Sequence, residues 1–228
     1  MSRILFRNPI AFLLLAVTPY AFAGDDLIDR WATAAGGRDK VATIKAIYRE
    51  ADLEFGPYKG ALKVWHTADG KYRKEEKIGD VSTVEIFDGA KGTIKEGDGP
   101  ARDMTSPELE ISKAKRFANA NAMFFAFFPE RRHGTVSTET EGTIVLKPEG
   151  GVEWRINLDP QTSLPKTMVH KEGDRTITVT FASYETVDGI QFEKEIHRSA
   201  GGPAGAVIRF TKTVINPPIE PGLLSTKP

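Results

Sequence analysis

Short segments in which apolar and polar residues alternate, separated by tight turns, constrain the fold of this chain more than any other feature. The clearest one, residues 152–159, reads Val-Glu-Trp-Arg-Ile-Asn-Leu-Asp. A period of two places such residues on opposite faces of a β-strand, and dipeptides such as Asp69-Gly70 and Asp88-Gly89 favour hairpin turns. Roughly ten or eleven such strands follow one another, which predicts an antiparallel meander or barrel instead of a parallel α/β fold.

Residues 107–128 interrupt this alternation. Thr105 or Ser106 can cap a helix that starts with a proline, and Pro129 ends the segment. The second half is apolar around almost the whole helical circumference, because it contains Phe117, Met123, Phe124, Phe125, Phe127 and Phe128. Two interpretations remain open. The segment is either a buried core helix or a lid whose apolar side closes over an apolar cavity.

A sheet with this many strands and one apolar face must curve to bury that face. Helical spacing predicts two further helices ahead of the first strand, over residues 25–35 and about 38–44. The sequence therefore predicts a mainly β fold with covering helices (α+β), built as an unclosed antiparallel β-barrel of about 11 strands with a helical lid.

The first 23 residues have the order of features found in a signal peptide. Arg3 and Arg7 precede an apolar run over residues 10–17, and Ala21-Phe22-Ala23 supplies a small-x-small cleavage site. The apolar run is too short to be retained as a membrane-spanning helix. We therefore expect export to the periplasm, cleavage before Gly24, and a single domain over residues 24–228 without a stable membrane anchor.

The composition excludes several classes of function. The chain has no cysteine, so it cannot carry a lipid-modified cysteine, a thiolate-ligated metal or a cysteine nucleophile. Lysine and arginine together number 31, as do aspartate and glutamate, and this balance argues against binding to nucleic acid. Binding through apolar contacts stays open.

No pattern typical of a catalytic or metal centre is found in the sequence. The four histidines lie in four separate segments, and no serine lies in a Gly-x-Ser-x-Gly elbow. No Walker or dinucleotide-binding pattern is present either. We accordingly expect neither catalysis nor a metal or cofactor.

The remaining signal is an excess of large apolar side chains, which suit ligands of irregular shape. A cavity lined in this way binds acyl chains through desolvation, at roughly 0.8 kcal/mol per buried CH₂ group. The predicted ligand-binding residues are Trp65, Phe117, Met123, Phe124, Phe125, Phe127, Phe128 and Trp154.

Several segments together resemble the LolA/LolB-like family of periplasmic lipoprotein-sorting proteins. Residues 60–66, Gly-Ala-Leu-Lys-Val-Trp-His, resemble the family's Gly-x-Leu-x-Val strand, and residues 87–91, Phe-Asp-Gly-Ala-Lys, resemble its Asp-Gly-Lys hairpin. Residues 159–165, 187–190 and 215–218 resemble further stretches of LolA-like proteins. Most of the mature chain is covered by these matches, which consist largely of turn residues.

The resemblance implies an eleven-stranded unclosed barrel, a helical lid and carriage of acyl chains of a lipoprotein or another lipid. The implied partners are an inner-membrane exporter and an outer-membrane acceptor. Where the family commonly has Lys-Arg-Pro, with an arginine that helps to control the lid, this chain has Trp65-His66-Thr67. His66 is therefore a candidate polar gate. The alternative is an envelope interaction or assembly module with the same fold and no ligand transport.

Overall fold

The computed structural model describes residues 23–139, 142–201 and 205–226. The predicted signal peptide lies outside these residues except for Ala23, which begins the first helix, α1 (Ala23–Ala34). Helix α2 (Arg38–Ala42) precedes the first set of strands, and helix α3 (Ser106–Lys115) follows it. Three short elements follow α3: η1 (Asn119–Asn121), α4 (Ala122–Ala126) and η2 (Pro129–Arg131).

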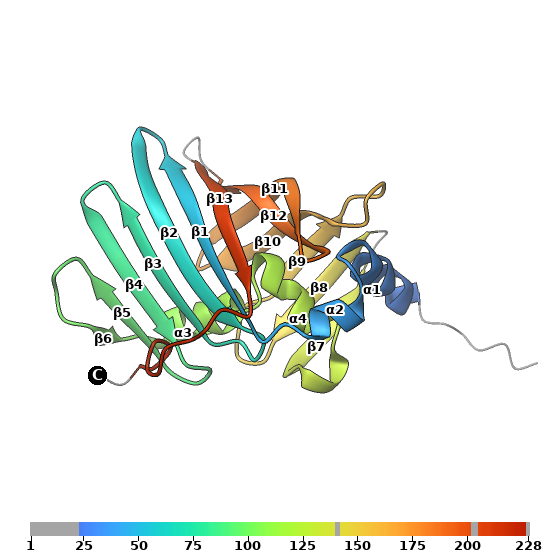
Figure 1. The fold of residues 1–228 in the computed structure, drawn as a ribbon, viewed down its shortest axis with the longest axis horizontal. Helices are drawn as coiled ribbons and strands as arrows, with labels where there is room; N and C mark the ends of the chain where they lie inside the picture. The colour runs from blue at the N-terminus through green and yellow to red at the C-terminus, as the bar shows by residue number, and fades with distance from the viewer. Residues whose placement is uncertain (1–22, 140–141, 202–204, 227–228) are drawn as a thin grey trace, which may run out of the picture.

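Thirteen strands of the described residues form one antiparallel sheet, which Figure 1 shows as strongly curved. The first six strands are β1 (Ala46–Phe55), β2 (Tyr58–Thr67), β3 (Tyr72–Ile78), β4 (Val81–Phe87), β5 (Gly92–Glu96) and β6 (Arg102–Asp103). The other seven are β7 (Gly134–Thr138), β8 (Thr143–Pro148), β9 (Trp154–Leu158), β10 (Pro165–Glu172), β11 (Arg175–Val187), β12 (Ile190–Ser199) and β13 (Gly205–Ile215).

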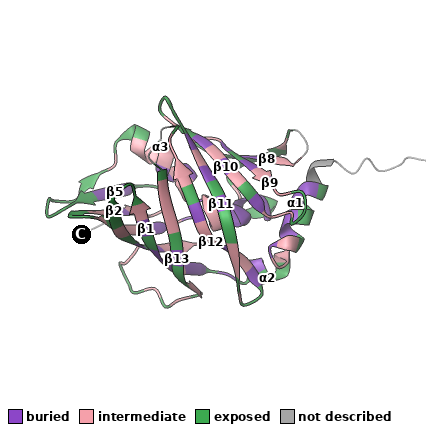
Figure 2. Cartoon of the chain, turned by 90° about the horizontal axis from the view of Figure 1, so that it is seen from above, coloured by how far each residue is buried: buried purple, intermediate pink, exposed green. Residues whose placement is uncertain are grey.

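The sheet consists of two meanders joined in the middle. Its order is β6-β5-β4-β3-β2-β1-β13-β12-β11-β10-β9-β8-β7, so β1 pairs with β13, with Ile47 opposite Ile215 and Phe55 opposite Ala206. The strands at the two ends, β6 and β7, do not pair with each other, and the barrel is therefore unclosed, as the sequence predicts. Figure 2 shows the alternation of buried and exposed residues along these strands.

The strand number differs from the predicted value of about 11 because the short strands β6 and β7 have no strong sequence signal. Strand β6 has two residues, and β7 reads Gly-Thr-Val-Ser-Thr, in which Val136 is the one large apolar side chain. Both lie at the ends of the sheet, where pairing on one side is sufficient. Backbone pairing to a neighbouring strand forms them, and a periodic apolar pattern does not.

The segment between the two meanders is not the continuous helix that the sequence predicts. Helix α3 begins after Thr105, whose N–H donates to Glu108 Oε2 at 2.8 Å in a capping box, as expected, but it ends at Lys115. Asn119 then has φ 52°, a left-handed conformation that asparagine tolerates better than most residues. The chain therefore changes direction before α4, and the large rings of this segment pack in several directions.

The predicted N-terminal helices are present as α1 and α2, which pack beside the β11–β12 turn, and α1 also contacts the edge strand β7. Gly36 has φ 116°, and a Cβ atom there would lie 2.2 Å from the carbonyl oxygen of Gly189 in the β11–β12 turn. The neighbouring backbone bond, from Gln191 N–H to the Ala35 carbonyl, measures 2.9 Å. Among the described residues, no helix has the length and apolar character needed to cross a bilayer.

Candidate ligand cavity

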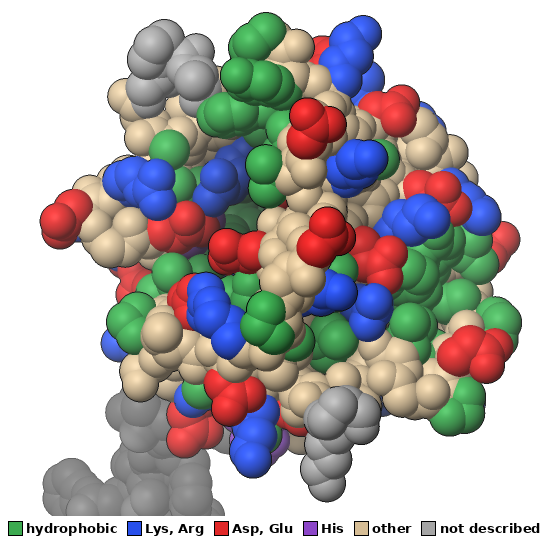
Figure 3. Space-filling model, turned by 90° about the vertical axis from the view of Figure 1, so that its left-hand side faces the viewer, with side chains coloured by type: hydrophobic (Ala, Val, Ile, Leu, Met, Phe, Trp, Pro, Cys, Tyr) green, Lys and Arg blue, Asp and Glu red, His purple; other side chains and the backbone are tan. Residues whose placement is uncertain are grey.

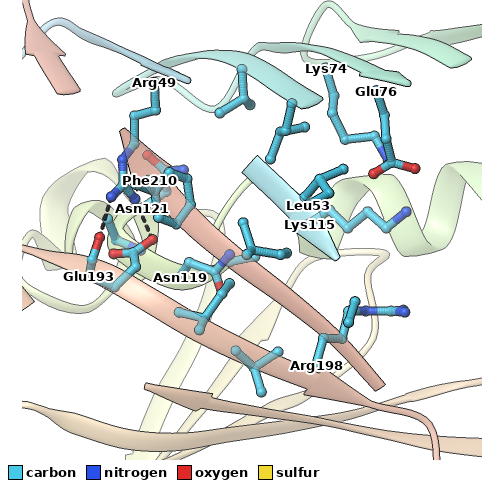
Figure 4. Close-up of a pocket in the computed structure, with 18 of the residues that line it drawn as sticks. Arg49, Leu53, Lys74, Glu76, Lys115, Asn119, Asn121, Glu193, Arg198 and Phe210 are labelled. Carbon is cyan, nitrogen blue, oxygen red and sulfur yellow. Dashed lines mark hydrogen bonds and ion pairs between the residues drawn. The ribbon is translucent and has the colours of Figure 1, made fainter. Parts of the chain in front are cut away.

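A cavity of about 490 Å³ lies between the concave face of the sheet and residues 118–121, the segment around η1. This volume is within the range of roughly 300–1,000 Å³ that is typical of small-molecule sites. Figure 4 shows its lining side chains, which come from both meanders of the sheet and from the segment between them. The apolar part of the lining includes Ile47, Leu53, Leu62, Val64, Ile78, Trp154, Val179, Ile196, Ile208 and Phe210.

The register of the strands explains why aliphatic side chains meet in this cavity. Leu53 on β1 is opposite Ile208 on β13, and Ile208 is opposite Ile196 on β12. Directly opposed residues of antiparallel strands point to the same face. The three side chains therefore form a continuous aliphatic row across the junction of the two meanders, which we call the aliphatic wall.

One end of the cavity contains a buried ion pair between Arg49 on β1 and Glu193 on β12. Arg49 Nη1 lies 2.5 Å from Glu193 Oε1, and the two side chains are 5% and 2% exposed. The Arg49 guanidinium also lies 3.3 Å from the centre of the Phe210 ring and donates through Nε to Thr213 Oγ1 at 3.1 Å. Burial lowers the pKa of Arg49, and the adjacent carboxylate opposes this shift.

The ion pair also contacts the segment that covers the cavity. The N–H of Ala120, in η1, donates to Glu193 Oε1 at 3.4 Å. Asn119 and Asn121 also line the cavity, and each has a buried side-chain Oδ1 without a hydrogen-bond partner in the described structure. Figure 4 shows Asn121 beside Arg49 and Glu193, with Asn119 facing the cavity between the two ends.

The other end of the cavity is lined by charged side chains from several elements. Lys74 on β3 places Nζ 3.0 Å from Glu85 Oε1 on β4, and Lys115 on α3 places Nζ 3.8 Å from Glu85 Oε2. On the opposite meander, Arg198 Nη2 lies 3.0 Å from Glu172 Oε1. We call Lys74, Glu76, Glu85, Lys115, Glu172 and Arg198 the charged mouth. In Figure 3 the molecule is hollowed, and basic and acidic side chains border the hollow.

Two carboxylates of the charged mouth, Glu172 and Glu85, are held in the ionised state by their neighbours. His170 Nε2, 3.1 Å from Glu172 Oε1, and the charge of Arg198 lower the pKa of Glu172 to about 2. For Glu85, burial by itself raises the pKa, but the ammonium group of Lys74 and then that of Lys115 lower it overall. Each carboxylate therefore requires a cation beside it.

His66, the candidate polar gate, lines the cavity, and its ring centre lies 5.4 Å from that of Tyr72. Burial and the charge of Arg49 lower the pKa of His66 to about 3. The imidazole is therefore neutral near pH 7 and contributes a polar but uncharged surface to the cavity.

Of the predicted ligand-binding residues, Trp154 lines the cavity, where it is 2% exposed and stacks on His170 with ring centres 3.9 Å apart. Trp65 lies on the opposite face of the sheet, next to Tyr48, with ring centres 4.7 Å apart. Because its neighbour Val64 faces the cavity, the period of two directs Trp65 away from it.

The six large side chains of residues 117–128 are buried but do not line the cavity. They are 0–7% exposed and belong to the hydrophobic core. Phe117 packs on Phe125 with ring centres 4.7 Å apart, and Phe127 packs edge-on against Trp31 at 4.8 Å. Of the two interpretations of this segment, the buried core helix describes its large rings. The part that covers the cavity is the stretch Ala118–Asn121, which has small and polar side chains. The remaining members of this group are Met123, Phe124 and Phe128.

The sequence prediction missed the charged residues of the site, although one of them has a sequence signal. Arg49 occupies an inward position of β1, between Ile47 and Ala51, where the alternation calls for an apolar residue. A charge at such a position requires a buried partner. Its partner, Glu193, is 144 residues away along the chain, and no local pattern identifies it.

The comparisons with known proteins found no matching family model and no matching curated protein. Solved structures do match over most of the chain, with a LolA-type fold. A DUF1329 family protein from Desulfovibrio piger is 12% identical, with a TM-score of 0.58, and the match covers 89% of this chain and 97% of that one. A LolA superfamily protein from Nitrosomonas europaea is 8% identical, with a TM-score of 0.52 and coverages of 86% and 94%.

A third match has the same fold. A putative outer membrane lipoprotein-sorting protein domain from Vibrio parahaemolyticus is 9% identical, with a TM-score of 0.51, and covers 87% of this chain and 94% of its own. At these identities the matches establish the fold and not the ligand. The unclosed, mainly β architecture that the sequence resemblance implied is thereby confirmed.

Proposed function

We propose that this protein is a periplasmic carrier that binds the acyl chains of a lipoprotein or another lipid in the cavity between the sheet and Ala118–Asn121. The observation that carries the proposal is the aliphatic wall of that cavity, formed at the junction of the two meanders. The LolA-type fold supports it, because one protein with this fold is described as a lipoprotein-sorting domain. Binding, and not catalysis, is the proposed activity.

The physical basis is desolvation of hydrocarbon. Each CH₂ group that moves from water into an apolar cavity contributes roughly 0.8 kcal/mol, from which the costs of association are subtracted. Leu53, Ile196 and Ile208 offer apolar contact without a hydrogen-bonding requirement, so they accept acyl chains of different identity. Trp154 and His66 remain the predicted ligand contacts from the sequence that border this space.

The cellular part of the proposal follows from the predicted signal peptide. After its removal, residues 24–228 would act as a single periplasmic domain that receives its ligand from an inner-membrane exporter and delivers it to an outer-membrane acceptor. The hydrophobic chains would be shielded from water during transfer, since the cavity covers them on the sheet side and on the η1 side.

The test measures uptake of a fluorescent fatty acid by the purified mature protein, together with native mass spectrometry for co-purified lipid. We expect saturable binding, and loss of at least tenfold in affinity when Val64→Trp fills the cavity. Trp65→Phe, one residue along the same strand but on the outer face, is the matched control and should bind as the wild type does. Absence of both co-purified lipid and probe uptake would leave the non-transport interaction module as the better account.

A further inference from the structure

The charged mouth places basic side chains from three separate elements on one side of the cavity. Lys74 comes from β3, Lys115 from α3 and Arg198 from β12. Figure 4 shows all three on the side away from the Arg49–Glu193 pair, with the aliphatic wall between the two ends. A ligand that lies along this wall would therefore have one end next to the three basic groups.

The carboxylates of the charged mouth are already engaged by these cations. Glu172 is shared by Arg198 and His170, and Glu76 Oε2 lies 3.6 Å from Lys74 Nζ. Glu85 contacts Lys74 at 3.0 Å and Lys115 at 3.8 Å, so Lys115 has the longer and weaker of the two contacts. Buried Glu85 Oε2 has no hydrogen-bond partner, which shows that Lys115 does not approach it closely enough to donate.

Lys115 is thus a partly enclosed ammonium group whose nearest counter-charge, Glu85 at 3.8 Å, is shared with the closer Lys74. Its side chain is 35% exposed, and burial lowers its pKa because the attraction of Glu85 does not offset the loss of hydration. Lys74 and Arg198 add repulsion to the same group. An anionic group at this position would offset both the loss of hydration and the repulsion between the cations.

We propose that the charged mouth binds the anionic head group of an amphiphile, phosphate or carboxylate, through Lys115 with support from Lys74 and Arg198, while the acyl chain lies against the aliphatic wall. This inference rests on the proposed carrier function and specifies the class of its ligand. Apolar contact supplies most of the affinity, and the basic side chains select anionic over neutral amphiphiles of the same chain length.

The experiment compares four probes by isothermal titration calorimetry: lysophosphatidylglycerol and palmitate as phosphate and carboxylate amphiphiles, monopalmitoylglycerol as a neutral one, and inorganic phosphate alone. All three amphiphiles carry a palmitoyl chain and are used below their critical micelle concentrations. We expect the two anionic probes to bind about tenfold more tightly than the neutral one, in keeping with a charge-assisted hydrogen bond, and phosphate alone to show no binding. The relative affinity of the first two identifies the preferred head group.

Two variants on the same helix separate the role of Lys115 from a general loss of positive charge. Lys115→Gln should abolish most of the anionic preference, because it should weaken binding of the two anionic probes about tenfold more than binding of monopalmitoylglycerol. Lys113→Gln is the matched control, since Lys113 lies beside the β8–β9 turn at Gly150 and outside the cavity. Raising the salt concentration should reduce the anionic preference of the unmodified protein, which tests the inference without any substitution.

The outcomes distinguish the two proposals. Equal affinity for anionic and neutral probes, or an unchanged preference in Lys115→Gln, would overturn the head-group inference and leave the carrier function standing. Binding of phosphate alone with the same affinity as the anionic amphiphiles would overturn it as well. If none of the amphiphiles binds, the carrier function itself fails, and the head-group inference fails with it.

Discussion

Residues 117–128 and the concave face of the sheet are both strongly apolar, yet only the sheet face borders a cavity. In the segment, planar rings pack against each other and against the helices, as Phe117 does on Phe125 and Phe127 on Trp31. On the sheet, shorter aliphatic side chains such as Leu53 and Ile208 project from a curved surface and leave space in front of them. Apolar content therefore predicts burial, whereas side-chain length and curvature decide where a hollow remains.

The largest expected effect concerns the ring cluster. Phe125 is fully buried, so Phe125→Ala should lower the free energy of unfolding by about 3–5 kcal/mol through lost contacts and a new cavity. Urea denaturation measures this loss, and the folded variant should still bind the fluorescent fatty acid. Tyr58→Ala, at a side chain that is 58% exposed, is the control and should have little effect on stability. If Phe125→Ala lost probe affinity without losing stability, the ring cluster would be part of the ligand site and not of the core.

The buried ion pair between Arg49 and Glu193 at one end of the cavity should have the next largest effect. Glu193→Gln leaves the Arg49 charge buried without its carboxylate, and we expect unfolding to become easier by about 3 kcal/mol. The double variant Arg49→Met/Glu193→Leu removes both charges and should be less destabilised than Glu193→Gln alone. Thermal melting of the three proteins gives the comparison. Wild-type stability of Glu193→Gln would show that the cavity tolerates an unpaired cation.

The charged mouth should contribute a pH-dependent stability on the order of 1–3 kcal/mol. The pKa of Glu172 is about 2 in the folded protein, against an ordinary value of 4.5 for glutamate. Because the folded-state pKa is depressed, the stabilisation is complete above pH 4.5 and is lost as the pH falls toward 2. The difference in stability between the wild type and Glu172→Gln, measured by urea denaturation, should shrink over that window. A difference that is constant with pH would contradict the assigned cause.

The smallest expected effect concerns the outer face of the sheet. Trp65 and Tyr48 are directly opposed on β2 and β1, and an aromatic pair of this kind contributes roughly 0.2–1 kcal/mol. Trp65→Ala should therefore cost less than about 1 kcal/mol and should leave probe binding unchanged. A large loss of probe affinity in Trp65→Ala would restore its sequence-based assignment as a ligand contact.

The sequence predicted the order and type of the main elements because they depend on local chemistry. Turn dipeptides such as Asp69-Gly70 and the alternation in residues 152–159 act within a few residues, and the structure has a hairpin and strand β9 at these places. The prediction of a continuous helix over residues 107–128 was wrong, because α3 ends at Lys115 and the backbone is extended at Ala118 and left-handed at Asn119. Local helix propensity did not reveal that break. The rings after it pack on different partners, such as Phe125 on Phe117 and Phe127 on Trp31, and these contacts are tertiary.

The sequence by itself determined an antiparallel, strongly curved sheet with helices between and before its strands. The alternation of apolar residues, the turns and the helix caps each depend on residues that are close together in the sequence. Only the tertiary structure decided which apolar side chains fill the core and which surround a hollow. It also brought Arg49 to Glu193 and placed Lys74, Lys115 and Arg198 at one mouth. The physical reason is that curvature and strand pairing bring together residues far apart along the chain, and no periodicity records which of them meet.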